Sequence, residues 1–414
     1  MKSFLNKHNA FYKYQYGFRE NHSTDHALIE IVDGIKLDID SSKLAGGIFV
    51  DLTKAFDTVN HKILLEKLKH LGIRGIPNKL LESYLTNRHQ YVQINDHKSS
   101  LRSINCGVPQ GSVLGPLLFI LYINDLVNCS KEKIKIRIFA DDTAVYFACS
   151  NIADFKKLIK AIMEHLDKWF TANLLTLNTD KSYFCIFRTT QNHSINLPNE
   201  ITFNAKTIKR ARSIKYLGIT LDEFLNWNEH ITCTIKSLKS LFSVFYNIRR
   251  YLTIEHIKVI YYTMIYSRIR YGICAYGFAK KESMDKVQIL QNKLLKVLLE
   301  MEWRTPTNEL HNRLDILQVK DLFRQEISTF FYNYFQGNLP AGFTGYYQFF
   351  DHDRETRGKL SLLRLPRCKT ELGKKTVKVL GTTIWNKLGK DLKDISNQKS
   401  FRKAIKNGIL KYPT

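Results

Sequence analysis

The sequence predicts an α+β fold in which a strand-rich first half is followed by a helical second half. Short apolar or alternating runs at residues 48–50, 134–138 and 183–187 are typical of strands. From Trp227 onward the apolar residues recur at the spacing of amphipathic helices. A chain of 414 residues with 44% hydrophobic residues and 8 prolines is long and apolar enough for two or three globular domains.

The charge of the chain predicts a polyanionic partner. The formal net charge is +25, and most of the excess Lys and Arg lies after residue 230. Such an excess suits either nucleic acid or an acidic membrane surface. The longest apolar run, at residues 116–123, is far shorter than the ~20 residues that a membrane span needs. We therefore expect nucleic acid, and no membrane, as the partner.

The cysteines constrain the compartment and the metal chemistry. The 7 cysteines are scattered and form neither a C-x-x-C pair nor a Cys/His cluster. Zinc and a disulfide framework are therefore not expected. No signal-peptide pattern opens the sequence. Together these features predict an intracellular protein, in the nucleus or the cytoplasm.

Two adjacent carboxylates lie between runs that favour strands. Alternating residues at 134–138 and apolar residues at 145–147 predict a hairpin with Asp141 and Asp142 at its tip. A plain hairpin turn more often carries Asn-Gly or Asp-Gly, whereas two neighbouring anions repel. One interpretation is a bound divalent cation, because hard cations prefer carboxylate oxygens. The alternative is a solvated acidic turn.

A third carboxylate ends the apolar strand at residues 48–50. A carboxylate at the end of a buried strand costs free energy unless it is paired or bound to a metal. We therefore expect Asp51 to lie near Asp141. Phe56 follows five residues later and could lie beside whatever Asp51 binds; core packing is the alternative.

Two further segments indicate places where a ligand approaches the backbone. Glycines and prolines at residues 107–116 predict a loop that carries the Gln110 amide and Gly111. The run Gln15-Tyr-Gly-Phe-Arg19 precedes a helix that residues 21–24 would cap. Arg19 beside a helix start would suit a phosphate; an ordinary surface arginine is the alternative.

The second half combines basic and aromatic residues on predicted helices. Residues 231–248 carry one amphipathic stripe, Thr253 opens a second helix, and residues 284–299 form a third. Lys and Arg lie on these helices with Tyr and Phe between them, which suits a nucleic-acid backbone. A solvated basic face is the alternative. Before these helices, residues 215–222 predict a single strand that bends at Gly218.

These signals occur in an order that resembles the reverse transcriptases of non-LTR retrotransposons, especially jockey-like elements. The resemblance is strong over about residues 12–230 and fainter to about residue 330. Six motifs in the family's order are far more specific than any one of them. The matching segments are Gln15-Tyr-Gly-Phe-Arg19 with Ser23-Thr24, Phe49-Val-Asp51 with Lys54-Ala-Phe-Asp57 and His61, Gly107-Val-Pro-Gln-Gly-Ser112 with Gly115-Pro-Leu-Leu-Phe119, Phe139-Ala-Asp-Asp142, Leu177-Asn178 with Lys181, and Tyr216-Leu-Gly218 with Leu221-Asp222.

The resemblance implies a right-hand polymerase with partial fingers, a palm of antiparallel strands backed by helices, and a helical thumb. Residues 1–225 would form the partial fingers and palm, residues 226–335 the thumb, and residues 336–414 a basic C-terminal region. The implied activity is RNA-directed DNA polymerisation. The implied partners are an RNA template, a DNA primer and deoxynucleoside triphosphates.

The resemblance also implies roles for single residues. Asp51, Asp141 and Asp142 would hold two Mg²⁺, with Mn²⁺ as a possible substitute, for nucleotide transfer to a primer 3′-hydroxyl. Lys181 would be the general acid for pyrophosphate, or only a charge partner. The nucleotide-binding residues would be Arg19, Phe56 as the steric gate against a ribose 2′-hydroxyl, Gln110 and Gly111, and the primer grip would be Tyr216, Leu217 and Gly218.

Two departures from the family's pattern leave an alternative open. The chain starts after the Arg-Pro-Ile-type segment of its relatives, so we expect an N-terminally truncated reverse transcriptase. Neither an endonuclease domain nor a Cys/His knuckle is expected in it. The alternative is a truncated, catalytically silent relic that only binds nucleic acid. A nuclease or cyclase on a similar palm is a third interpretation, but it gives the Gly-Val-Pro-Gln-Gly loop no purpose.

Overall fold

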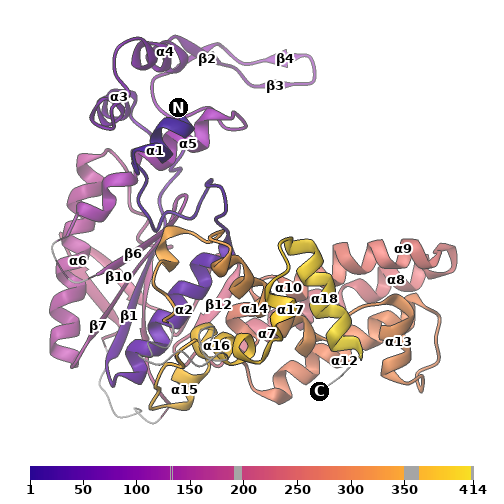
Figure 1. Cartoon of the computed structure of the whole chain (residues 1–414). Coiled ribbons are helices and arrows are strands. Elements are labelled where there is room, and N and C mark those ends of the chain that lie inside the picture. Colours follow the sequence, from indigo (N-terminus) through magenta and orange to yellow (C-terminus); the bar gives the residue numbers. More distant parts are fainter. Residues whose placement is uncertain (131, 133, 191–197, 349–362, 412–414) are drawn as a thin grey trace.

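The computed structural model describes residues 1–130, 132, 134–190, 198–348 and 363–411. The strand-rich half and the helical half lie beside each other, as the composition of the chain predicts (Figure 1). A six-stranded sheet in the order β6-β7-β1-β8-β10-β9 forms the centre of the first half. Its strands are β1 (Leu44–Val50), β6 (Lys135–Phe139), β7 (Asp142–Cys149), β8 (Tyr183–Phe187), β9 (Glu200–Phe203) and β10 (Lys206–Arg210).

The sheet is mixed, and the expectation of a purely antiparallel sheet was wrong in one pairing. Strands β6, β7, β1 and β8 pair antiparallel, as do β9 and β10, but β10 runs parallel to β8. The cause is the connection between them. The chain reverses direction once between β8 and β9 and again between β9 and β10, so β10 runs in the same direction as β8.

Both faces of the sheet are buried by helices. Alternate residues of β8 point to opposite faces, with Cys185 and Phe187 in one hydrophobic cluster and Phe184 and Ile186 in the other. Helix α2 (Thr24–Asp40) packs in the first cluster, and α6 (Ile152–Ala172) packs in the second. Figure 1 shows these two helices on opposite sides of the strands. The sheet is therefore a rigid support for side chains at the strand ends.

A smaller layer lies beyond the end of the sheet that carries the acidic turn (Figure 1). A two-stranded ribbon follows α4 and projects away from this layer. The helices of the layer are α1 (Lys2–Lys7), α3 (His61–His70), α4 (Ile76–Leu85), α5 (Leu114–Tyr122) and the 3₁₀ helix η1 (Asn124–Asn128). The strands of the ribbon are β2 (Arg88–Gln90), β3 (Gln93–Ile94), β4 (His97–Lys98) and β5 (Arg102–Ile104).

Residues 215–222 form a hairpin rather than the single bent strand that the sequence predicts. Strand β11 (Ser213–Tyr216) pairs antiparallel with β12 (Ile219–Asp222). Leu217 and Gly218 both adopt positive φ, at 44° and 76°, which makes a tight two-residue turn. The glycine allows the chain to reverse where the sequence suggested only a bend.

The helical half matches the predicted helices with one interruption. The stripe at residues 231–248 is divided between two helices that meet at Ser240, and Thr253 caps the next helix through its side chain. The helices are α7 (Asn228–Lys239), α8 (Leu241–Ile248), η2 (Arg249–Tyr251), α9 (Ile254–Ile260), the π-helix η3 (Tyr261–Tyr266), α10 (Ser267–Arg270), α11 (Ile273–Tyr276), α12 (Lys281–Leu298), α13 (Thr307–Leu314) and α14 (Val319–Phe335).

The C-terminal region returns to the first half and packs against α2. Asp33 accepts hydrogen bonds from the backbone N–H groups of Val377 (3.0 Å) and Lys378 (2.9 Å). Asp40 similarly binds the backbone of Lys369 and Thr370. The elements of this region are η4 (Ala341–Phe343), α15 (Glu371–Lys374), α16 (Val377–Lys387), α17 (Lys390–Lys393) and α18 (Gln398–Lys411).

Membrane-spanning helices are absent from the part of the chain that the structure describes, because none of its helices is both long enough and apolar enough.

Candidate active site

Strand pairing brings the predicted carboxylates together. Strand β1 pairs with β7 so that Val50 lies opposite Thr143. One step further along both strands reaches Asp51 and Asp142, and Asp141 lies next to them in the turn between β6 and β7. Asp51 and Asp142 line a cavity of about 410 Å³. Side chains ninety positions apart in the sequence therefore share one site.

The three carboxylates concentrate negative charge at one end of the sheet. Desolvation by the surrounding protein atoms, together with the negative charges of Asp141 and Asp51, raises the pKa of Asp142 to about 6. Within the described residues, no Lys, Arg or His forms an ion pair with any of the three. Such a site gains free energy by binding a cation.

The segment at residues 14–17 holds the acidic turn in place. Tyr16 N–H donates to the Ile138 carbonyl (2.8 Å), which aligns this segment with the edge of β6. The buried Gln15 Oε1 accepts hydrogen bonds from Gly17 N–H (2.8 Å) and from Ala140 N–H (3.2 Å). Ala140 is the first residue of the turn and has a positive φ of 55°. Gln15 thus holds the backbone that carries Asp141.

Gly17 is required by the same contact. A Cβ atom at Gly17 would lie 2.4 Å from the Ala140 nitrogen, so a side chain there would push the turn away. Behind the segment, the buried Arg137 of β6 pairs with Glu30 of α2, which also accepts a hydrogen bond from the Tyr16 hydroxyl. The turn is therefore supported by a buried polar network as well as by strand pairing.

The backbone of Asp51 is held by the connection that precedes β8. Asp51 N–H donates to the Ser182 hydroxyl (3.0 Å), and its carbonyl accepts from Asn178 N–H (3.0 Å). Lys181 lies between these two residues, is exposed, and lines the same cavity as Asp51. The structure thus brings the predicted lysine to the same cavity as Asp51 and Asp142.

Phe56 belongs to an aromatic column beside the Asp51 loop. Its half-buried ring stacks on Phe119 of α5, with ring centroids 4.2 Å apart, and meets the edge of Phe18 at 6.3 Å. Phe18 is exposed and adopts a positive φ of 55°. Stacking on a buried ring fixes the orientation of Phe56 while its other side stays accessible.

The Gly/Pro loop docks against the same segment as Phe56. Val108 N–H donates to the Phe56 carbonyl (2.9 Å), and Gly107 N–H donates to the Val59 carbonyl (2.8 Å). The Gln110 amide donates to the Asp57 carboxylate (2.7 Å), and Gly111 beside it is exposed. Gln110, Gly111 and Phe56 therefore lie in one part of the structure.

Strand β11, which leads into the β11–β12 turn, lines the same cavity as Asp51 and Asp142. The buried Tyr216 lines the cavity and packs its ring edge-on against Phe49 (5.2 Å). Burial and then the charge of Asp142 raise the pKa of the Tyr216 hydroxyl. Tyr271, at the end of α10, donates its hydroxyl to the Leu217 carbonyl (2.7 Å). The helical half thereby holds the turn that carries the predicted primer grip.

Comparison with known proteins identifies the family. The family model for "Reverse transcriptase (RNA-dependent DNA polymerase)" matches residues 1–221, which is more than half of the chain. The chain belongs to the reverse transcriptase family. The matched residues of this reverse transcriptase sequence include Asp51, Asp141, Asp142 and Lys181.

The similarity to jockey-like elements is also confirmed. The RNA-directed DNA polymerase from mobile element jockey of Drosophila melanogaster is 30% identical over 324 residues, which cover 75% of this chain and 34% of the relative. Its counterpart from Drosophila funebris is 28% identical over 325 residues, which cover 76% and 35%. The chain therefore spans about a third of the length of these curated relatives.

Two solved structures of telomerase are also similar to this reverse transcriptase sequence. Telomerase from Candida albicans in complex with a fragment of telomeric RNA has a TM-score of 0.36 and 14% identity, with 81% of this chain and 56% of that chain covered. Apo telomerase from Candida tropicalis has a TM-score of 0.39 and 12% identity, with 81% and 57% covered.

Arg19 has its partners within the N-terminal segment. Its guanidinium donates to the Tyr12 carbonyl (2.9 Å) and lies over the Phe11 ring at 5.0 Å. Of the predicted site residues, only Asp51, Asp142, Lys181 and Tyr216 line the carboxylate cavity; Arg19, Phe56, Gln110, Gly111, Asp141, Leu217 and Gly218 do not. Arg19 holds the N-terminal segment, and a nucleotide would have to compete for it.

Three residues at the site were not predicted from the sequence. Gln15 supports the acidic turn, Ser182 holds the Asp51 backbone, and Tyr271 holds the β11–β12 turn. Gln15 lies in a motif that the sequence analysis quoted, but its role depends on a partner 125 positions away. Tyr271 precedes Gly272, which interrupts the helical pattern and could have drawn attention to this position.

The ligands at the cavity fit a hard divalent cation. The three carboxylates supply only oxygen ligands, and the reverse transcriptase family typically uses divalent metal ions. No three Asp, Glu, His or Cys side chains among the described residues form a ready-made metal cage. Mg²⁺ does not need one, because it keeps several waters and binds through one or two carboxylates together with substrate phosphates.

Proposed function

We propose that the chain carries the polymerase core of a jockey-like non-LTR retrotransposon and acts as an RNA-directed DNA polymerase. The observation that carries this proposal is that Asp51 and Asp142 line one cavity, with Asp141 next to Asp142 in the adjoining turn and no ion-pair partner for any of the three among the described residues. In this interpretation residues 1–225 are partial fingers and palm, residues 226–335 are the thumb, and residues 336–414 are a basic C-terminal region.

The carboxylates would bind the catalytic ions. Asp51, Asp141 and Asp142 would hold two Mg²⁺, or Mn²⁺ in their place. When bound, these ions lower the pKa of the attacking hydroxyl and neutralise charge on the transferred phosphoryl and leaving pyrophosphate. The chain supplies a rigid mounting for the ligands, through the β1–β7 register and the Gln15 hydrogen bonds. A rigid mounting lowers the cost of orienting the reactants.

Selection of the nucleotide would fall to the aromatic column and the Gly/Pro loop. Phe56, fixed by Phe119, would exclude a ribose 2′-hydroxyl by its bulk. Gln110 and Gly111 would border the nucleotide opposite Phe56. Arg19 would contact the triphosphate only after releasing the Tyr12 carbonyl.

Lys181 would act on the leaving pyrophosphate, and the β11–β12 turn would hold the primer. The exposed Lys181 ammonium lies at the cavity and would donate a proton to the leaving pyrophosphate oxygen. Tyr216, Leu217 and Gly218 would hold the primer end, with Tyr271 fixing the turn through the Leu217 carbonyl. The basic helices of the second half would bind the phosphates of the template–primer duplex, so affinity should fall steeply with salt.

The decisive experiment is primer extension on an RNA template with Mg²⁺. The double variant Asp141→Ala/Asp142→Ala should lose extension by about 10³-fold or more, because both changes remove ligands of the catalytic ions. Its thermal unfolding should match the wild type. Equal extension by the variant would refute the site, and template binding by a wild type that cannot extend a primer would support the silent relic.

The gate can be tested separately. Phe56→Ala should increase incorporation of ribonucleotides relative to deoxyribonucleotides, because the cavity beside the sugar becomes larger. A change of about tenfold or more in the ratio of the two kcat/KM values is expected. Phe18→Ala, which removes only the edge contact, serves as the matched control. Unchanged sugar discrimination in Phe56→Ala would exclude the gate role.

A further inference from the structure

In the part of the chain that the structure describes, no helix or strand covers either face of the ribbon formed by β2, β3, β4 and β5. Strand β2 pairs with β5, and β3 pairs with β4 beyond them. Every residue from position 86 to 103 is exposed to solvent. A two-stranded ribbon alone is marginally stable in water, and such ribbons normally pack against a third strand or a helix. The exposed faces of this ribbon therefore call for an explanation.

The ribbon carries large apolar side chains where solvent would favour polar ones. Their exposed fractions are 49% for Tyr91, 64% for Val92, 69% for Ile94 and 63% for Leu101. Single exposed apolar residues are ordinary, but four on one unsupported ribbon mark a surface that contacts another molecule.

The charge of the ribbon identifies the chemistry of that molecule. Arg88, Lys98 and Arg102 oppose one acidic residue, Asp96. In the described part of the chain, no acidic side chain forms an ion pair with any of these three cations. The Lys98 ammonium instead lies 5.3 Å from the centre of the Tyr91 ring. Arg88 donates to the Tyr84 carbonyl (3.3 Å) and lies over the Tyr84 ring at 5.3 Å. Cations that have no acidic partner and lie beside aromatic rings are typical of surfaces that bind single-stranded nucleic acid.

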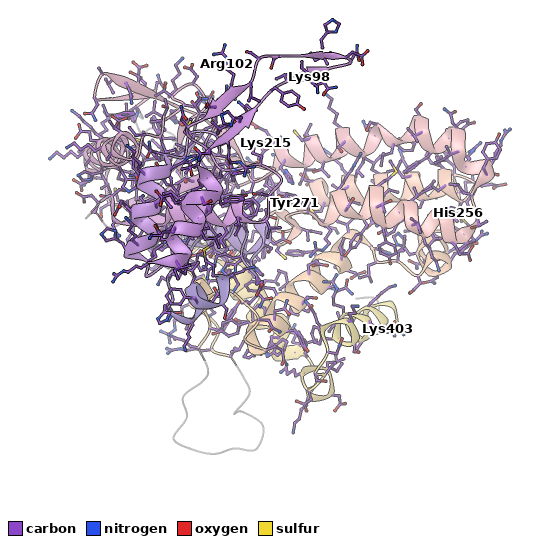
Figure 2. The ribbon with its side chains drawn as sticks, turned by 90° about the horizontal axis from the view of Figure 1, so that it is seen from above. Lys98, Arg102, Lys215, His256, Tyr271 and Lys403 are labelled. Carbon is purple, nitrogen blue, oxygen red and sulfur yellow. The ribbon has the colours of Figure 1, made fainter. Side chains whose placement is uncertain are left out.

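The position of the ribbon relates it to the candidate active site. It leaves α4 and extends over the same side of the molecule as the helical half (Figure 1). Seen from above, Lys98 and Arg102 lie on the ribbon, and Lys215 lies on the body of the molecule (Figure 2). Lys215 lines the carboxylate cavity. None of the described residues that line this cavity belongs to the ribbon, so the ribbon lies outside the cavity.

We propose that residues 88–104 form a binding surface for single-stranded RNA outside the catalytic cavity, where the template would approach. The phosphates would contact Arg88, Lys98 and Arg102, and a base would stack on Tyr91. That the bound strand is the template rests on the proposed function, whereas RNA binding by the ribbon does not.

Fluorescence anisotropy with a labelled single-stranded RNA of about 16 nucleotides tests the surface on the full chain. Lys98→Ala/Arg102→Ala should weaken binding by about tenfold and reduce the slope of log affinity against log salt by about 1.4. Tyr91→Ala should weaken binding while leaving the salt slope unchanged. The matched control, Lys156→Ala/Lys157→Ala, removes two exposed lysines of α6, on the far face of the sheet, and should change affinity by less than about twofold.

Two results would overturn the proposal. One is wild-type affinity and salt slope in both ribbon variants. The other is unchanged RNA binding together with reduced self-association of Tyr91→Ala/Ile94→Ser in sedimentation, which would assign the ribbon to contacts between protein copies. The ribbon variants should lose less affinity for a blunt RNA–DNA duplex than for single-stranded RNA. Equal losses of affinity for the two ligands would contradict the proposal that the ribbon binds the single-stranded template. Asp141→Ala/Asp142→Ala should keep full RNA binding, so failure of the proposed catalysis is read separately.

Discussion

Asp40 and Asp142 carry the same side chain in opposite surroundings. Asp40 is buried at the end of α2, and its carboxylate accepts hydrogen bonds from Lys369 N–H (2.9 Å) and from the N–H (2.6 Å) and hydroxyl (2.7 Å) of Thr370. Burial alone would raise its pKa, but these donors outweigh burial and lower it. In contrast, desolvation and the neighbouring carboxylates of Asp141 and Asp51 raise the pKa of Asp142 to about 6.

The difference separates structural acids from acids held ready for a ligand. The structural carboxylate of Asp40 accepts hydrogen bonds from backbone N–H groups that lie more than 300 positions away in the sequence. Around Asp142 the chain supplies further negative charge instead. Since folding alone gains nothing from such repulsion, the cost is consistent with a site that a cation completes.

The largest effect on folding is expected at Asp40. Asp40→Ala removes the acceptor of the Lys369 and Thr370 backbone N–H groups and of the Thr370 hydroxyl, and should lower the free energy of unfolding by about 3 kcal/mol. Urea unfolding measures this directly. Asp142→Ala is the matched control, and should leave the stability unchanged or slightly higher because it relieves repulsion. If both variants unfold alike, the distinction between the two carboxylates is wrong.

A smaller effect is expected when the support of the acidic turn is removed but its carboxylates stay. Gln15→Met keeps the side-chain volume and removes the acceptor for the Gly17 and Ala140 N–H groups. The extension rate should fall by about tenfold, and the Mg²⁺ concentration for half-maximal rate should rise, because the ligands are less well positioned. RNA binding should not change. A drop in stability with unchanged Mg²⁺ dependence would make Gln15 a packing residue only.

The smallest effect is a dependence on pH, with opposite signs at the two acids. Asp142 has a folded-state pKa of about 6, above its usual value, so its contribution favours folding at low pH and is lost as pH rises through about 6. The lowered pKa of Asp40 stabilises the fold above the usual Asp pKa of about 3.9, and this contribution is lost as pH falls through the folded-state value.

The same titration predicts the behaviour of the metal site. Cations bind the ionised carboxylate, so the affinity for Mn²⁺ measured by electron paramagnetic resonance should decrease as pH falls through about 6. Asp142→Asn should remove this inflection. A pH-independent affinity in the wild type would show that Asp142 is not a ligand.

Many elements of both halves could be predicted because their signals are local. The strand at residues 183–187 coincides with β8, the helix after Thr24 coincides with α2, and Thr253 caps α9. Period-2 and period-3.6 patterns report which face of an element is buried, and capping residues report where it begins. The hairpin at residues 213–222 was missed because a bend and a full reversal at Gly218 leave nearly the same sequence signal.

The sequence by itself determined which residue types stand at the ends of the strands, including the carboxylates and the aromatic and glycine residues around them. Only the tertiary structure decided that Asp51 lies opposite Asp142 and that β10 runs parallel to β8. It also decided two hydrogen bonds, from Ala140 N–H to Gln15 and from Thr370 N–H to Asp40. The physical reason is that these contacts join segments far apart in the chain. Their free energies depend on how the complete core packs, and no local pattern carries that information.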